Sequence, residues 1–173
     1  MVKRTKLIED PSEVVLLLRV FASELSKKVL DKLGNGWHTT SEIAEELGEP
    51  VEAVEGAISA LKRCMLVDVQ WRMPRSPGEK PEKEYTTIYG RVHLNCRCTL
   101  EEVTEVISLT FASDSDISQD IEELKEHIRK GNKSVANIAK DMKISPMRVK
   151  GIARRSADIV VKGHRIDFAP KEW

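Results

Sequence analysis

The sequence carries one apolar pattern twice, with the two copies 95 positions apart. A proline opens the second half of each copy, and the matching positions are Ile43 with Ile138, Ala44 with Ala139, Leu47 with Met142, Val54 with Val149 and Gly56 with Gly151. This spacing predicts two short helices joined by a tight turn, the helix-turn-helix that places a helix in the major groove of DNA. A chain of 173 residues is long enough for two such domains, each with its own core.

The composition fits a soluble, helix-rich protein. Hydrophobic residues make up 40% of the chain and charged residues 32%, whereas 28 basic and 28 acidic side chains cancel. The longest apolar run, Val14 to Leu18, is far shorter than a membrane span, and the sequence shows no secretory segment. Three cysteines without an export signal argue against a disulfide framework, so we expect a cytoplasmic protein.

The first half begins with a capped helix. Asp10 is the expected N-cap and Pro11 the first helical residue, and the apolar pattern predicts a long helix, with one break at most, as far as Leu33. Val15 and Leu16 lie outside its main apolar stripe. An apolar face wider than one core requires predicts a second partner, for which a homodimer is the first candidate.

A helix-turn-helix and a hairpin follow in the first half. Thr39 and Glu42 form a capping box for a helix through Leu47, and Pro50 opens the next helix. Two strand-like segments, 66–71 and 85–94, flank an exposed turn over 74–81. Two helices followed by a hairpin predict a winged helix.

The second half repeats this order in a shorter form. A helix over 99–116 connects the halves, with Val103, Val106, Ile107 and Phe111 as its apolar residues. Asp116 and Gln119 are expected to cap the next helix, and Ser134 and Ser145 the two after it. A short hairpin over 159–168 follows. The expected domains are an N-terminal winged helix over 10–98, the connecting helix over 99–116 and a C-terminal winged helix over 117–170.

The segment Ser41–Leu47, followed by the run from Pro50 to Leu66 and a strand-loop-strand, resembles the winged helix-turn-helix domains of ArsR and MarR-like transcription regulators of prokaryotes or archaea. The second half resembles a smaller domain of the same superfamily. The resemblance implies a mainly α fold with small β-hairpin wings (α+β), in tandem winged helix-turn-helix domains. It also implies binding to duplex DNA. The first helix pair lacks the metal-binding signature of arsenic- or zinc-sensing members, so we expect no cofactor.

Charge separates the two halves. Residues 101–126 hold nine acids and one base, whereas residues 129–165 hold eleven bases and two acids. Cationic side chains that neutralise phosphates release counterions and favour binding to DNA. The net charge of zero therefore results from an acidic link and a basic module that cancel.

The last predicted helix, after Pro146, is the expected DNA reader. Its apolar Val149, Ile152 and Ala153 are expected to face the core, which leaves Met147 and the basic residues outside. Arg148 is placed to reach a guanine edge. Phosphate contacts are expected from Lys133, Lys150, Arg154, Arg155, Lys162 and Arg165. The alternative is a solvated basic face that balances the acidic link or docks on it.

The first helix pair is a poorer reader of DNA, because Glu52, Glu55 and their neighbours repel phosphate. Its wing is more basic and offers Arg72, Arg75, Lys80 and Lys83. This domain therefore either contacts DNA through its wing or binds another protein of the transcription or replication machinery.

The cysteines allow a further alternative. His93, Cys96 and Cys98 lie close together in the sequence, and Cys64 follows the first recognition helix, which would suit a thiol- or metal-responsive regulator. The spacing matches no standard zinc pattern, and lone cysteines usually pack as small apolar residues. No catalytic constellation is present in the sequence, so we expect no enzyme. The sequence favours a DNA-binding transcription regulator.

Overall fold

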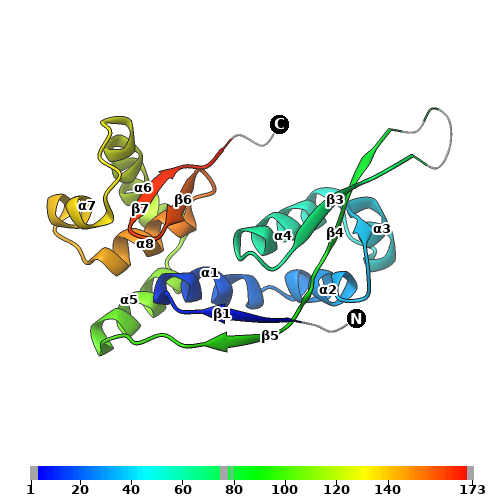
Figure 1. Cartoon of the computed structure of the whole chain (residues 1–173), viewed down its shortest axis with the longest axis horizontal. Helices are drawn as coiled ribbons and strands as arrows, with labels where there is room; N and C mark the ends of the chain where they lie inside the picture. Colours follow the sequence, from blue (N-terminus) through cyan, green and yellow to red (C-terminus); the bar gives the residue numbers. More distant parts are fainter. Residues whose placement is uncertain (1–3, 75–77, 79, 171–173) are drawn as a thin grey trace. The chain divides into compact units, whose positions relative to one another are not determined.

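The computed structural model describes residues 4–74, 78 and 80–170. The chain forms two compact units, unit 1 from the residues up to Leu7 with Val20–Leu94, and unit 2 from Ile8–Arg19 with the residues from Asn95 onward. Helices dominate, and small antiparallel sheets accompany them, as the predicted α+β winged-helix class requires (Figure 1). No helix in the described part of the chain is long and apolar enough to cross a bilayer.

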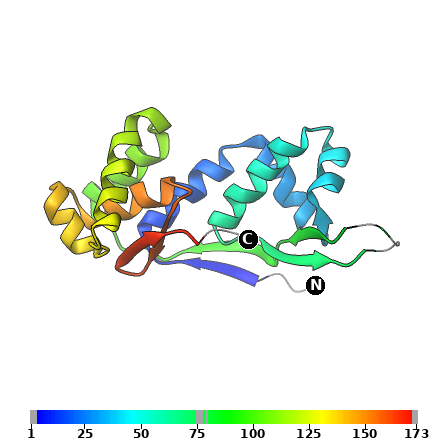
Figure 2. The same ribbon diagram turned by 90° about the horizontal axis from the view of Figure 1, so that it is seen from above.

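Unit 1 has the element order of a winged helix. Its elements are β1 (Arg4–Ile8), α2 (Glu24–Leu33), β2 (His38–Thr39), α3 (Thr40–Leu47), α4 (Val51–Arg63), β3 (Asp68–Arg72), β4 (Glu82–Thr86) and β5 (Tyr89–Leu94). Helices α2, α3 and α4 lie on one side of the β3–β4 hairpin (Figure 2). The centre of the core consists of five side chains that are 0% exposed: Val29, Leu33, Ile43, Val54 and Leu61. The helix pair is therefore where the apolar pattern predicted it, whereas the hairpin is formed by 68–72 and 82–86 and not by the predicted 66–71 and 85–94.

The strand predicted over 85–94 is two strands. β4 ends at Thr86 and pairs with β2 and β3, whereas β5 pairs with β1. The sequence did not predict strand β1. The chain changes partner at Thr87, whose amide donates to the carbonyl of Leu33 at the end of α2 (3.1 Å). Continuous alternation of side chains hides this break, because the alternation pattern carries no information about which strand is the partner.

Unit 2 repeats the order of helix pair and hairpin. Its elements are α1 (Pro11–Phe21, of which the last two residues belong to unit 1), α5 (Leu100–Phe111), α6 (Asp114–Arg129), α7 (Val135–Met142), α8 (Pro146–Arg155), β6 (Ile159–Lys162) and β7 (Arg165–Phe168). The predicted long first helix is broken, since α2 begins anew with Ser23 as its N-cap. Helix α6 begins at Asp114 with a capping box of Ser113 and Asp116, so the cap predicted from Asp116 and Gln119 was wrong.

Two helices predicted outside the second domain contribute to the core of unit 2. Val15 of α1 and Val106 and Leu109 of α5 are buried there with Val149 and Ile152 of α8. The segment expected as a connecting helix therefore packs on the second helix pair. Val15 and Leu16 are both buried within the chain. They therefore give no support to the dimer that was inferred from these two side chains.

Candidate nucleic-acid interface

Helix α8 forms the centre of unit 2. Val149, Ile152 and Ala153 are fully buried, as predicted. Met147, expected outside, is only 5% exposed, and that expectation was wrong. Four helices and a strand account for this burial, because α8 packs against α5, α6, α7 and β6, and Val15 of α1 joins the same core.

The basic side chains along α8 have partners within unit 2. The Nζ of Lys150 lies 2.8 Å from an Oδ of Asp10, and the Nε of Arg154 donates to the Oγ of Ser12 at 2.9 Å. Burial by itself raises the pKa of Asp10, but hydrogen bonds from Lys150 and Ser12 outweigh it and lower that pKa. The carboxylate that caps α1 therefore also binds the cation of Lys150.

Arg155 is an interior residue. Its side chain is 2% exposed and donates to the carbonyls of Leu109 and Ala112 and to Asp114, 2.6 Å away. The Nη2 of Arg148 lies 3.6 Å from Asp120. Asp114 and Asp120 belong to the acidic segment 101–126, so two of the four basic side chains of α8 contact the acidic link.

The hairpin of unit 2 keeps its cations at the surface. Lys162 and Arg165 face each other across the β6–β7 turn, and both are exposed. The hairpin is tied to the segment before α7, since the amide of Ile166 donates to the carbonyl of Lys133 (2.9 Å). Lys133 forms an ion pair with Asp167 at 2.8 Å and is half-buried. We call Lys133, Lys162 and Arg165 the unit 2 wing corner.

Two exposed lysines were not among the candidates. Lys140 lies near the end of α7, and Lys143 occupies the turn between α7 and α8 with a positive φ of 55°. Both belong to the basic run over 129–165, so charge counting had already included them. Their exposure distinguishes them from the basic residues of α8.

The cations on the wing of unit 1 are of two kinds, those bound to acids within the unit and those on the hairpin surface. Arg72 binds Glu84 and Glu42, and both contacts raise its pKa. The Nζ of Lys83 lies 5.5 Å from the centre of the Trp71 ring, and Lys80 is exposed. Arg75 lies outside the described residues. Arg72 therefore holds the wing to α3, while Lys80 and Lys83 remain on the hairpin surface.

The contact between Arg72 and Glu42 predicts a pH dependence. Hydrogen bonding to Arg72 lowers the pKa of Glu42 from 4.5 to about 2. Because the folded pKa lies below the unfolded one, the stabilisation is complete above pH ~4.5 and is lost as pH falls toward ~2. We expect Glu42→Gln to cost about 1 kcal/mol at neutral pH, a value discounted for the solvent exposure of the pair, and less at pH 3.

Urea unfolding of both proteins at pH 7 and pH 3 measures this difference. Glu49→Gln, which changes a nearby carboxylate on the α3–α4 turn, is the matched control and is expected to show the same loss of stability at both pH values. An equal cost of Glu42→Gln at the two pH values would contradict the assignment.

The exposed face of α4 is acidic and apolar. Val51 is 39% exposed, and Glu52, Glu55 and Ser59 are also exposed. These side chains offer no positive charge at the helix start, as the sequence predicted. The DNA-contact candidates of unit 1 therefore lie on its wing and not at the start of α4.

The candidate thiol and metal residues do not form one site. Cys64 is buried in unit 1, whereas Cys96 and Cys98 belong to unit 2. Burial raises the pKa of Cys96, which disfavours the reactive thiolate. His93 is exposed on β5. Among the described residues, no group of three or more His, Cys, Asp or Glu side chains is arranged to hold a metal ion.

Comparison with known proteins assigns the family. The family model described as ArsR transcriptional regulator matches residues 8–170, which include the described parts of both helix pairs and both hairpins. A search of curated proteins found no match. The matched segment spans nearly the whole sequence, so the likeness is not confined to one helix pair. The chain belongs to the ArsR family of transcriptional regulators.

Proposed function

We propose that the chain is a tandem winged-helix regulator that grips duplex DNA through its wings and the lysines beside the second helix-turn-helix. The observation that carries this proposal is the division of charge within unit 2. The cations of α8 are engaged with acids and carbonyls, whereas Lys162 and Arg165 are exposed on the β6–β7 turn. Exposed cations keep more of their attraction for phosphate than cations held inside the unit by an acid or a carbonyl.

Lys140 and Lys143 extend this cationic surface. They lie on the helix-turn-helix itself, at the end of α7 and in the turn that leads to α8. Lys80 and Lys83 supply the corresponding charge on the wing of unit 1. Contacts of this kind position a protein on the phosphate backbone without reading sequence. We therefore expect affinity with a steep salt dependence.

Charge reversal on the unit 2 wing corner tests the proposal. The double variant Lys162→Glu with Arg165→Glu is expected to weaken binding to duplex DNA by at least about tenfold and to flatten its salt slope. Electrophoretic retardation or fluorescence anisotropy at several salt concentrations measures both quantities. The matched control is Lys28→Glu with Arg97→Glu, two exposed cations with the same change in net charge. Equal losses in the two double variants would contradict a specific role of the wing.

The variant Arg148→Glu with Lys150→Glu is a poorer test. Reversal of Lys150 places a carboxylate against Asp10 inside unit 2, so a loss of DNA binding would also follow from damage to the fold. The wing variants avoid this difficulty because both side chains are exposed.

We further propose that the protein is a homodimer that pairs through α5. Leu100, Val103, Ile107 and Phe111 are 87%, 38%, 50% and 80% exposed. They follow helical spacing along one face, and Thr104 and Ser108 flank them without charge. A second copy can therefore pack against this stripe without bringing like charges together. The stripe supplies on the order of 400 Å² per copy, about half of a standard interface, and would form its centre.

Multi-angle light scattering tests the dimer. Ile107→Glu is expected to convert a dimer into a monomer, because it places a carboxylate at the centre of the apolar stripe. Ser118→Glu, at an exposed position of α6, is the control and is expected to remain dimeric. A monomeric parent protein at micromolar concentration would overturn this part of the proposal.

One observation favours a second role for unit 1. The exposed start of α4 combines Val51 with Glu52 and Glu55, a surface suited to a basic, partly apolar protein partner. A winged helix that contacts the transcription machinery remains the second candidate function. DNA binding that survives all charge reversals on the unit 1 wing would favour it.

A further inference from the structure

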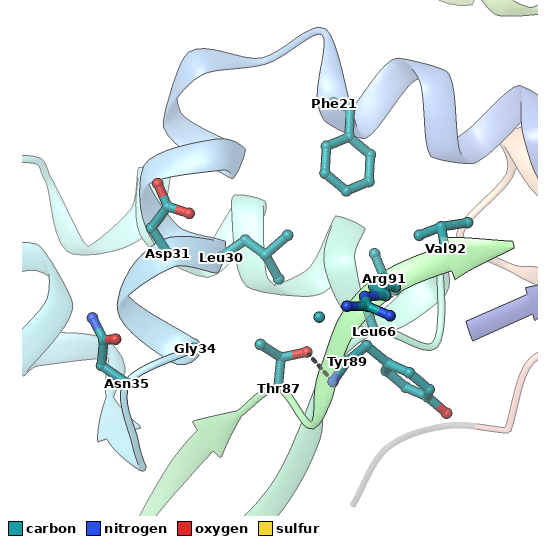
Figure 3. A pocket seen from close by; sticks show the side chains of 11 residues that line it. Phe21, Leu30, Asp31, Gly34, Asn35, Leu66, Thr87, Tyr89, Arg91 and Val92 are labelled. Atoms are coloured by element: carbon teal, nitrogen blue, oxygen red, sulfur yellow. Dashed lines mark hydrogen bonds between the residues drawn. The ribbon is translucent and has the colours of Figure 1, made fainter. Parts of the chain in front are cut away.

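A cavity in unit 1 lies apart from the cationic surfaces. Its volume is about 550 Å³, within the range of small-molecule sites, and it is open on one side. All of its lining residues belong to unit 1. They come from the end of α1, from α2 and the turn that follows it, from the loop before β3, and from the chain around β5. Figure 3 shows Phe21, Leu30 and Arg91 around this space.

The walls of the cavity are apolar. Phe21, Leu30, Leu66 and Val92 line it, and Phe21 and Val92 are 36% and 40% exposed although they face a concave surface. Apolar side chains that remain wet in a concavity gain free energy when a ligand covers them. The cavity therefore offers a binding surface for the hydrocarbon part of a small molecule.

Arg91 supplies the charge. It lies on β5, is exposed, and lines the cavity together with Val92 on the same strand. A guanidinium at the border of an apolar wall recognises a carboxylate through two parallel hydrogen bonds. Thr87 also lines the cavity, and its hydroxyl accepts from the amide of Tyr89 (3.2 Å, Figure 3).

Asp31 limits the charge of the ligand. Its carboxylate is exposed at the α2 side of the cavity and would repel a second negative group. A molecule with one carboxylate and an apolar body matches both Arg91 and the apolar side chains. The second carboxylate of a dicarboxylate would be repelled by Asp31. We infer that this cavity binds a small organic monocarboxylate with an aliphatic or aromatic body, held by Arg91 over Phe21, Leu30, Leu66 and Val92.

Titration with 2-naphthoate tests the inference without DNA, so its outcome is independent of the proposed DNA contacts. Amide signals of Gly34 and Gly90, which line the cavity, are expected to shift in ¹H–¹⁵N NMR spectra. Arg91→Gln is expected to weaken binding by at least about tenfold, since a charge-assisted pair is lost. Arg97→Gln, an exposed arginine outside the cavity, is expected to leave the affinity unchanged.

Two further probes distinguish the recognised chemistry. The dianion 2,6-naphthalenedicarboxylate is expected to bind more weakly than 2-naphthoate, and Asp31→Asn is expected to reduce that difference. The neutral 2-naphthalenemethanol is expected to bind weakly to the parent and equally to Arg91→Gln. An unchanged affinity for 2-naphthoate in Arg91→Gln, or the lack of any shift at Gly34 and Gly90, would overturn the inference.

Discussion

Arg155→Ala is expected to destabilise the protein by about 2–4 kcal/mol, because it removes a buried side chain and its hydrogen bonds to backbone carbonyls. The Arg155 side chain is 2% exposed and joins the end of α8 to the end of α5 and the start of α6. Its removal leaves the carbonyl of Leu109 without this donor, while the carbonyl of Ala112 keeps its hydrogen bond from Arg19 (3.3 Å), and it opens a cavity beside the core. Each buried group left without a partner carries the full cost of desolvation.

Urea unfolding followed by circular dichroism measures the change in free energy, and hydrogen–deuterium exchange locates it. We expect protection to be lost first in α5 and α8. Arg165→Ala, which removes an exposed arginine from the wing, is the control and is expected to change stability by less than about 0.5 kcal/mol. A similar stability of the two variants would mean that Arg155 does not hold these helices together.

Gly151→Val is expected to cost about 2–3 kcal/mol through overpacking, whereas Gly56→Val is expected to be close to neutral. The two glycines occupy the same position in the two copies of the sequence pattern. A Cβ on Gly151 would lie 2.5 Å from the Cδ1 of Leu109, and Leu109 is 1% exposed and has little room to move. A Cβ on Gly56 would meet no atom within 4 Å.

The same unfolding experiment compares the two variants. Gly56→Val serves as the matched control, because it makes the same chemical change in the same helix position of the other copy. Its mild effect reflects only the helix propensities of glycine and valine. Equal costs at the two sites would contradict the close approach of α5 to α8.

Local signals account for most of the helix boundaries. Thr39 with Glu42 and Thr99 with Glu102 form capping boxes in the structure, and Ser134 and Ser145 cap α7 and α8 as predicted. These motifs depend on residues three positions apart, so the sequence contains all the information they need. The partner of β5 is a different kind of feature, because β1 lies more than eighty residues away along the chain.

The cations of unit 2 show what the distribution of charge along the sequence leaves open. The run over 129–165 predicted a basic module, yet its position along the chain could not tell an exposed cation from one bound inside the unit. Lys150 contacts Asp10, 140 positions away in sequence, and Arg155 contacts the end of α5. Both contacts depend on which helices pack against α8, and neither has a local sequence signal.

The sequence by itself determined two helix pairs, through the repeated apolar pattern, and most of their caps, through polar residues at the helix starts, because these features depend on short-range spacing. Tertiary structure alone decided which face of each copy meets solvent. In the second copy α1 and α5 contribute to the core around Gly151 and α8, whereas around Gly56 of the first copy the space stays open. The physical reason is that burial of a helix face depends on neighbours that are distant in sequence, and a repeat of core residues does not encode those neighbours.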